Sequence, residues 1–336
     1  MSEYTGGTHL SPRMSTHESA AAPLPAPPQR ILVGASSAEA VAARIRAARP
    51  DLEIRAVPHT AVTPEDLAWA DAYVGFRRPS AAALGGVRWV HSTGAGVDPW
   101  LVPGALPETI LLTRSPQSFG PPIAEWTLAR MLAFTQALPA LSAAQMVARW
   151  AEPSVRPLAG TRALIVGTGD IGGTIARVLT PLGVDVIGVS RSGTAMPGLF
   201  RAVHRTDALP ELVPHCDWLI VVVPDTPATR GLISRDLLAR CRGVVLLNAG
   251  RGATVEEAAI PEALEAGCLR GAALDVFETE PLPPNSPLWR DPRVMISPHC
   301  SGLTTVEGAA DGFLECLALI ERGERPRWAI DRVRGY

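Results

Sequence analysis

Lysine is absent from this sequence of 336 residues, so arginine supplies all 31 basic side chains. Three classes of enzyme chemistry depend on the ε-amino group of lysine: P-loop nucleotide hydrolysis, Schiff-base catalysis and the Tyr-x-x-x-Lys catalysis of short-chain dehydrogenases. The missing residue type therefore excludes all three.

Cysteine is scarce, and neither sign of charge is in excess. The five cysteines have no C-x-x-C spacing, which favours neither a disulfide framework nor a zinc site and fits a reducing cytoplasm. A net charge of −2 gives no long-range attraction to nucleic acid or to an anionic membrane. No apolar run approaches the roughly 20 residues of a membrane span, and the N-terminus lacks the apolar core of a secretory signal. We expect a cytoplasmic protein without a metal whose partner is a small molecule.

The chain is long enough, and at 47% hydrophobic residues apolar enough, for two domains. Residues 1–29 are rich in Ser, Thr, Ala and Pro, which predicts a disordered leader. After them, short apolar runs alternate with helical patterns, which favours a parallel sheet covered on both faces. In this first unit, a helix is expected at 37–48 and strands near 31–34, 54–57, 72–75, 88–92 and 110–113.

A second series of strands follows a purely helical stretch. Residues 121–149 predict one or two helices bent near Pro139, and residues 304–322 predict a last helix that returns to the first unit. Pro261 is expected to kink a helix that Thr254 and Glu257 cap. The strands of this second unit are expected near 163–166, 184–190, 218–223, 244–248, 271–274 and 294–296.

This pattern predicts an α/β fold with two Rossmann-like lobes, each a doubly wound parallel sheet, and a cleft between them. The first lobe is discontinuous, formed by residues 30–119 and 304–336, and is flavodoxin-like and substrate-binding. Residues 120–303 form the dinucleotide-binding lobe.

The segment "ALIVGTGDIGGTIARVL" is an apolar strand, a glycine turn and a helix. Gly167 permits the tight turn, Gly169 lets the backbone approach a pyrophosphate, and Gly172 allows close contact between helix and strand. The phosphates then lie at the N-terminus of the helix, against its partial positive charge. A dinucleotide is therefore predicted to bind at the turn, which comprises Gly167, Thr168, Gly169, Asp170, Ile171 and Gly172.

The end of the next strand indicates which dinucleotide binds. An NAD site normally offers a carboxylate there to the ribose 2′-hydroxyl, but this sequence has Ser190, Arg191 and Ser192 and no acid. An arginine with two serines suits a 2′-phosphate, because charge-assisted hydrogen bonds of this kind contribute on the order of 1.5–3 kcal/mol. NADP(H) is therefore the preferred cofactor, and NAD(H) is possible.

Three charged or titratable residues follow expected strands: Arg251, Glu280 and His299. Ligands of open α/β sheets bind at the carboxyl ends of the strands, so these side chains are expected to converge. Reduction of a carbonyl by hydride requires a proton donor, and a histidine is the usual one. A neighbouring carboxylate orients that histidine and favours its charged form, while an arginine can bind a substrate carboxylate and polarise the adjacent carbonyl.

The motifs "NAGRG", "GAALDVFETEPLPPNSPLW" and "SPHCSG", together with the glycine turn, resemble the D-isomer specific 2-hydroxyacid dehydrogenase family. The resemblance extends from about residue 30 to the closing "DRVRGY" and implies that Arg251, Glu280 and His299 form the catalytic set. "SRSG" and "EPLPPNSPLW" resemble in particular the branch of NADPH-dependent glyoxylate/hydroxypyruvate reductases.

The resemblance also implies further site residues. "HSTGAGVD" is similar to the family's loop that holds the substrate carboxylate, at Ala95 and Gly96, and "GFRRP" places Arg77 where some relatives bring a second cation to the substrate. With Arg251 and His299, these residues form the expected substrate set. The implied cofactor contacts beyond the glycine turn and Ser190–Ser192 are Val223, Pro224, Thr229, Ala249, Gly250, Asp275, His299 and Ser301.

The expected activity is the NAD(P)H-dependent reduction of a small 2-keto acid, such as glyoxylate or hydroxypyruvate, to the D-2-hydroxy acid. Two alternatives stay open: dehydrogenation of another 2-hydroxy acid, such as D-3-phosphoglycerate or a bulky phenylpyruvate-like compound, and a dinucleotide-sensing protein that resembles the family's transcriptional corepressors. Formate oxidation is disfavoured, because those relatives pair the histidine with glutamine rather than with an acid such as Glu280. The resemblance also implies a homodimer formed through residues 121–149.

Overall fold

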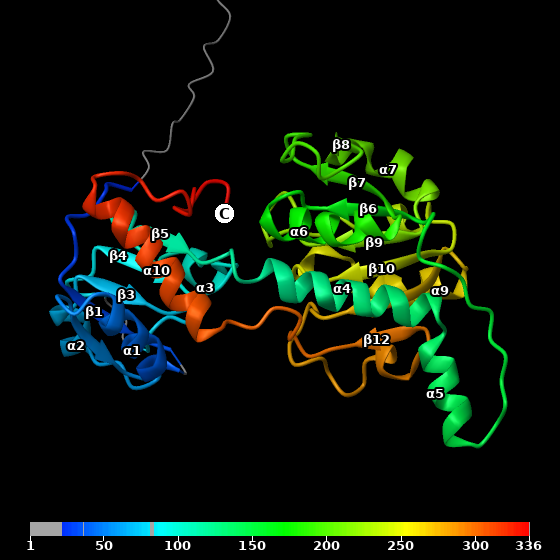
Figure 1. Ribbon diagram of the computed structural model, residues 1–336, viewed down its shortest axis with the longest axis horizontal. Helices are drawn as coiled ribbons and strands as arrows, with labels where there is room; N and C mark the ends of the chain where they lie inside the picture. The colour runs from blue at the N-terminus through cyan, green and yellow to red at the C-terminus, as the bar shows by residue number, and fades with distance from the viewer. Residues whose placement is uncertain (1–21, 36, 81–83, 336) are drawn as a thin grey trace, which may run out of the picture.

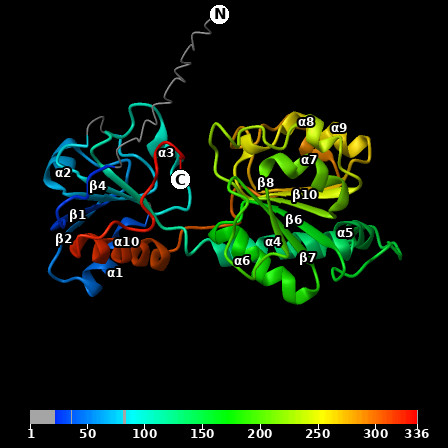
Figure 2. The same cartoon turned by 90° about the horizontal axis from the view of Figure 1, so that it is seen from above.

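The chain folds into two lobes, each built on a parallel β-sheet with helices on both faces (Figure 1). The computed structural model describes residues 22–35, 37–80 and 84–335. Figure 2 shows the lobes side by side, joined by the segment that enters α4 and by the segment that leads to α10. The predicted α/β fold of two Rossmann-type lobes is confirmed.

The first sheet has five parallel strands in the order β2-β1-β3-β4-β5. Each strand lies within one residue of its predicted bounds, because each is a short apolar run flanked by polar or turn residues. The strands are β1 (Arg30–Val33), β2 (Glu53–Ala56), β3 (Ala72–Val74), β4 (Trp89–Ser92) and β5 (Leu111–Arg114).

The second sheet has seven parallel strands in the order β12-β11-β10-β9-β6-β7-β8. Six of them lie within two residues of their predicted bounds, and the seventh, the edge strand β8, was not predicted. The strands are β6 (Arg162–Val166), β7 (Asp185–Ser190), β8 (Ala202–Arg205), β9 (Trp218–Val221), β10 (Val244–Asn248), β11 (Leu269–Leu274) and β12 (Val294–Ile296).

Helices cover both faces of each sheet. The α-helices are α1 (Ala38–Ala48), α2 (Pro64–Trp69), α3 (Asp98–Leu101), α4 (Gly120–Thr135), α5 (Leu138–Met146), α6 (Asp170–Leu179), α7 (Leu209–Leu212), α8 (Arg235–Leu238), α9 (Ile260–Glu265) and α10 (Val306–Glu321). The 3-10 helices are η1 (Thr180–Leu182), η2 (Thr206–Ala208), η3 (Val213–His215), η4 (Gly252–Thr254), η5 (Glu257–Ala259) and η6 (Pro287–Arg290).

Each sheet separates two apolar cores, one on each face. All five residues of β10 are buried, which explains why that strand is apolar without alternation. In the first lobe, α1 buries Val41, Ala42 and Ile45, the i, i+1, i+4 stripe of an amphipathic helix. The loops of the candidate site follow the carboxyl ends of these buried strands.

The helical stretch 121–149 bends slightly before the predicted position. Helix α4 ends at Thr135 and α5 begins at Leu138, with Ala137 in the left-handed region at φ 50° between them. Helix α4 packs against α6 in the second lobe, whereas α5 projects away from that lobe (Figure 1).

The C-terminal segment returns to the first lobe. Helix α10 packs against α1 and β5, and the Ile330 N–H donates to the Leu112 carbonyl oxygen. Residues 1–21 of the expected leader lie outside the described residues. Residues 22–29 form neither helix nor strand, and Leu24 packs against the core beneath α1 and α10.

The expected kink at Pro261 was a wrong prediction. Helix α9 begins at Ile260, so Pro261 occupies its first turn, where the missing N–H has no helical partner to lose. Thr254 belongs to the separate 3-10 helix η4 and does not cap α9. The break between η4 and α9, rather than a kink, accommodates the proline.

Candidate active site

The glycine turn joins β6 to α6, and two of its glycines are required by close packing. Gly167 has φ 110°, in the left-handed region, and a Cβ there would lie 2.8 Å from the Val222 carbonyl oxygen. A Cβ on Gly172 would overlap the Gly167 carbonyl group. Helix α6 can therefore start directly against the end of β6 only with these residues.

Gly169 has a different role, because a Cβ on it would meet no atom within 4 Å. It is the N-cap residue of α6, so the open space lies beside the free N–H groups of the first helical turn. Desolvation raises the pKa of Asp170, the first residue of the helix. Space and helix dipole together form a cradle that fits a dinucleotide pyrophosphate.

The end of β7 forms a closed polar turn. The Ser190 hydroxyl donates to the Thr194 carbonyl oxygen and accepts the Thr194 N–H, and Thr168 of the glycine turn donates to the same carbonyl. The Ser192 and Thr194 hydroxyls are 2.6 Å apart. The turn presents Arg191 at the surface, and the Thr168 hydrogen bond holds this turn against the glycine turn.

The loops that follow β9 and β10 lie against each other at the same edge of the sheet. A Cβ on Gly250 would be 2.7 Å from the Val223 carbonyl oxygen, and the Ala249 N–H donates to Val221. The Thr229 hydroxyl donates to the Pro224 carbonyl oxygen at 2.5 Å. All of these residues had been predicted to line the cofactor site except Val221, which belongs to β9.

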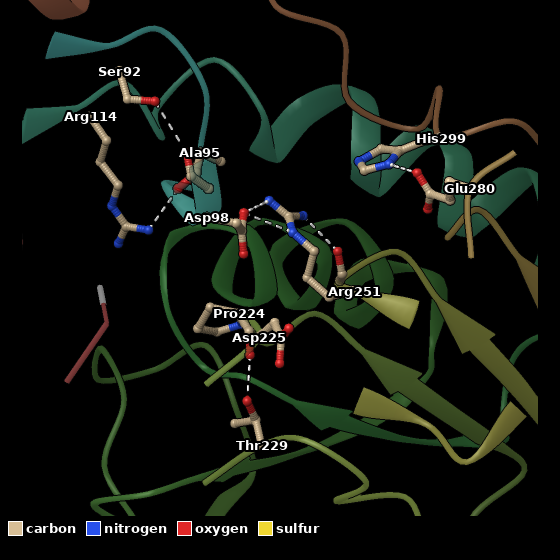
Figure 3. A network of polar contacts seen from close by, with 12 residues as sticks. Ser92, Ala95, Asp98, Arg114, Pro224, Asp225, Thr229, Arg251, Glu280 and His299 are labelled. Atoms are coloured by element: carbon tan, nitrogen blue, oxygen red, sulfur yellow. Dashed lines mark hydrogen bonds and ion pairs between the residues drawn. The ribbon is translucent and has the colours of Figure 1, made fainter. Parts of the chain in front are cut away.

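Glu280 and His299 form a hydrogen-bonded pair, with Nδ1 of the imidazole 2.8 Å from Oε2 of the carboxylate (Figure 3). The other carboxylate oxygen, Oε1, accepts the Phe277 N–H at 3.0 Å. Both oxygens of Glu280 are thus fixed, and the imidazole is left with Nε2 as its free ring nitrogen in this pair. His299 has φ 52°, so its backbone also adopts an unusual conformation.

Asp275 holds the turn that carries His299. This fully buried carboxylate accepts the Cys300 N–H and the Ser297 hydroxyl on Oδ1 and the Ser301 N–H on Oδ2, and the Asp275 carbonyl oxygen accepts the His299 N–H. Trp126 of α4 donates to the Ser297 hydroxyl and extends this buried network. Removing one acceptor of such a network leaves a buried donor unsatisfied.

Arg251 reaches from the end of β10 toward the first lobe and pairs with Asp98 at the start of α3 (Figure 3). Its Nε and Nη2 donate to Asp98 Oδ2 at 3.1 and 2.8 Å, and Nη1 donates to the Gly250 carbonyl oxygen at 2.7 Å. Within the described part of the chain, these bonds use three of the five N–H donors of the guanidinium. Two donors remain for a ligand.

The loop between β4 and α3 lies directly against this guanidinium. The carbonyl oxygens of Ala95 and Gly96 accept hydrogen bonds from Arg114 and from the Ser92 hydroxyl, respectively (Figure 3). The N–H groups of Ala95 and Gly96 have no acceptor among the described residues. Two free backbone donors beside a guanidinium are suited to bind a carboxylate.

The structure joins some of the predicted residues and leaves others apart. In the view of Figure 3, Arg251 lies between Asp98 and the His299–Glu280 pair, but no hydrogen bond or ion pair among the described residues connects Arg251 to that pair. Arg77 is exposed. Across residues 22–35, 37–80 and 84–335, its side chain forms neither a hydrogen bond nor an ion pair. Asp98 was not among the predicted site residues, although this acid is part of the motif "HSTGAGVD".

Among the described residues, no group of three or more His, Cys, Asp and Glu side chains is placed to hold a metal ion. The same residues include no helix with the length and apolar character needed to cross a membrane. The five cysteines are free.

Comparison with known proteins gives consistent matches. A family model described as "D-isomer specific 2-hydroxyacid dehydrogenase, NAD binding domain" matches residues 128–301. An uncharacterised protein in the mprR 3′ region of Streptomyces coelicolor is 36% identical over 250 residues, which is 74% of this chain and 90% of that protein.

Solved structures of other proteins are similar to this chain over both lobes. The D-isomer specific 2-hydroxyacid dehydrogenase of Xanthobacter autotrophicus Py2, in complex with NADPH and MES, is 30% identical with a TM-score of 0.82 over 92% of this chain and 100% of that one. The NADPH-dependent glyoxylate/hydroxypyruvate reductase of Sinorhizobium meliloti, in complex with NADP and sulfate, is 29% identical with a TM-score of 0.80 over 92% and 100%. Because the family model spans more than half of the chain, the prediction from the sequence is confirmed: this chain belongs to the D-isomer specific 2-hydroxyacid dehydrogenase family of NAD(P)-dependent oxidoreductases.

Proposed function

We propose that this enzyme reduces a small 2-keto acid, with glyoxylate or hydroxypyruvate as the leading substrates, to the D-2-hydroxy acid with NADPH. The observation that carries the proposal is the His299–Glu280 pair at the same sheet edge as Arg251 and the glycine turn. A proton donor, an anion-binding cation and a dinucleotide cradle are the three components that carbonyl reduction requires.

His299 is the general acid in this proposal. Glu280 accepts a hydrogen bond from Nδ1–H and holds the ring, which leaves Nε2 to donate a proton to the substrate oxygen. When bound, the reduced nicotinamide supplies a hydride to the keto carbon. The proton from His299 neutralises the oxygen as it becomes an alkoxide, a contribution of about 10²- to 10⁴-fold in rate for general acids of this kind.

Arg251 orients the substrate. Its two remaining donors face a carboxylate that the Ala95 and Gly96 N–H groups bind from the first lobe, and the guanidinium also polarises the adjacent carbonyl. Asp98 is a positioning residue, because its bonds to Nε and Nη2 fix the plane of the guanidinium. We keep Arg77 as a candidate for a second cation near the substrate.

The preference for NADPH rests on the turn after β7. Within the segment Ser190–Ser192 no carboxylate is available for a ribose 2′-hydroxyl, while Arg191 offers a charge-assisted bond to a 2′-phosphate. The Xanthobacter and Sinorhizobium structures, described with NADPH and NADP, support the same preference. NAD(H) remains a usable cofactor, because the glycine cradle binds the pyrophosphate that both dinucleotides share.

Each lobe has its own task in this proposal. Residues 120–303 bind the dinucleotide through the glycine turn, Val223, Pro224, Thr229, Ala249, Gly250 and Ser301. Residues 30–119 and 304–336 bind the substrate through the loop at Ala95 and Gly96. Asp275 lies beside the nicotinamide in this arrangement, and its three accepted hydrogen bonds make it a positioning residue for the His299 turn.

We also propose a homodimer through residues 121–149 and a cytoplasmic location. Helix α5 and the segment after it expose large apolar side chains, with Trp150 at 91% and Met146 at 85% exposure. Exposed apolar patches of this kind mark protein interfaces. The free cysteines fit a reducing compartment. The substrate and cofactor are small molecules, and neither nucleic acid nor a membrane takes part.

The test is a turnover assay with purified enzyme. NADPH is mixed with glyoxylate, hydroxypyruvate or another member of a panel of 2-keto acids, and NADPH absorbance is followed. His299→Ala is expected to lose about 10²- to 10⁴-fold in turnover while NADPH binding is unchanged. If the unsubstituted enzyme turns over no 2-keto acid in the panel but binds NADPH, the chain is a dinucleotide-sensing protein instead.

A further inference from the structure

The unpredicted edge strand β8 brings a second arginine to the turn after β7. The two strands are parallel, and the register pairs Ser190 with Arg205, the last residue of each strand. Because carboxyl ends of parallel strands lie at one edge of the sheet, Arg205 stands at the same edge as Arg191. Paired residues of neighbouring strands also direct their side chains to the same face.

The Arg205 side chain lies under the turn itself. A Cβ built on Gly193 would be 3.0 Å from Arg205 Cγ, so the aliphatic stem passes directly beneath the turn. Gly193 has φ 72°, in the left-handed region, and the hydrogen bonds between Ser190 and Thr194 close the turn over this stem. The pairing of β7 with β8 and the closed turn therefore fix the position of Arg205 relative to Arg191.

The guanidinium of Arg205 is available to an anion. Its side chain is 65% exposed, and its one ion pair in the described part of the chain is a 3.9 Å contact with Asp207. Exposed ion pairs at such a distance contribute little to stability. A phosphate dianion can therefore replace the Asp207 carboxylate as the partner of Arg205. Arg201, the residue immediately before β8, instead forms an ion pair with Asp185 at 2.5 Å.

We propose that Arg205 is a second specificity-determining residue for NADPH and binds the 2′-phosphate together with Arg191. Guanidinium groups bind phosphate oxygens in pairs, and two of them around one dianion discriminate a phosphorylated from an unphosphorylated ribose more strongly than one does. The inference rests on the proposed preference for NADPH. It adds that Asp207 competes with the cofactor for Arg205.

The experiment is calorimetric titration of the full chain with NADPH, NADH and 2′,5′-ADP as a fragment that carries the 2′-phosphate. Four variants are compared with the unsubstituted enzyme: Arg191→Ala, Arg205→Ala, Asp207→Asn and the control Arg201→Ala. Arg205→Ala is expected to lower the affinity for NADPH and for 2′,5′-ADP about tenfold and the affinity for NADH less than about twofold. A tenfold loss is at the lower end of the range for a hydrogen bond to a charged group, because Arg205 is exposed. Asp207→Asn is expected to bind NADPH as well as or better than the unsubstituted enzyme, and Arg201→Ala equally well.

The outcomes separate this inference from the proposed function. If the unsubstituted enzyme binds NADPH no better than NADH, the proposed cofactor preference is wrong and the inference falls with it. If NADPH is preferred and Arg191→Ala abolishes the preference while Arg205→Ala keeps it, only the inference about Arg205 is overturned. Equal losses of NADPH and NADH in Arg205→Ala would also overturn it, since they indicate a general disturbance of the turn.

Discussion

Substitution of Gly96 by alanine is expected to disable the site without unfolding the protein. A Cβ on Gly96 would lie 2.7 Å from Asp98 Oδ2 and 3.0 Å from Arg251 Cζ, and it would overlap Nη2 of the same guanidinium. Non-bonded heavy atoms in contact need about 3.5 Å, so the end of the guanidinium must move by more than about 1 Å. The Gly96 backbone lies outside the left-handed region, which means that alanine itself is compatible with the chain.

The displaced group is the far end of a long side chain, so the cost to the free energy of unfolding is expected to stay below about 1 kcal/mol. Catalysis is more sensitive, because a misplacement of about 1 Å can lower rates by about 10²-fold. We therefore expect kcat/KM for the 2-keto acid to fall about 100-fold, equivalent to about 2.7 kcal/mol of transition-state stabilisation. NADPH affinity is expected to stay unchanged.

The assay is a double-mutant cycle with Arg251→Ala. Because the alanine methyl acts on the guanidinium, Gly96→Ala should cost less than about twofold in kcat/KM once Arg251 is already removed. Thermal unfolding of each variant controls for damage to the fold. Full activity in Gly96→Ala, or an undiminished loss in the Arg251→Ala background, would refute the role given to the guanidinium.

Three further predictions address stability, the histidine turn and assembly. Burial lowers the pKa of His91 to about 3. Below about pH 6.5 the unfolded chain therefore binds a proton at this histidine that the folded chain does not bind. As a result, the free energy of unfolding falls by up to about 1.4 kcal/mol for each pH unit of acidification. In urea titrations between pH 6.5 and 4.5, His91→Gln should lose this part of the slope, and identical slopes would contradict the burial. Asp275→Asn should leave one donor of its network unsatisfied, costing about 1–3 kcal/mol of stability, and should lower kcat while KM for NADPH changes less; unchanged kcat would oppose its positioning role. In sedimentation, Trp150→Arg should convert a dimer to monomers, whereas a monomeric unsubstituted protein would reject the dimer.

Most of the fold could be predicted because apolar runs bounded by turn residues mark buried parallel strands. The exception, β8, is an edge strand of four residues, none of them fully buried, so "AVHR" carries no apolar signal. Pro261 misled the prediction for a similar reason: whether a proline kinks a helix or starts one depends on where the helix begins, which tertiary packing decides here.

The site could be predicted as far as strand ends determine it. Arg251, Glu280 and His299 each follow a strand of the second sheet, and topology alone brings them to one edge. Asp98 comes from the other lobe, and its pairing with Arg251 depends on how the lobes meet, which no local pattern encodes. The same holds for Arg205, since its register beside Ser190 required a strand that the sequence did not reveal.

The most direct test of the account is a crystal structure of the enzyme with NADP and oxamate, an unreactive analogue of a 2-keto acid. We expect the oxamate carboxylate on Arg251 and on the N–H groups of Ala95 and Gly96, with its carbonyl oxygen within hydrogen-bond distance of His299 Nε2. An oxamate bound away from His299, or a nicotinamide ring that does not face it, would contradict the assignment of these residues to carbonyl reduction.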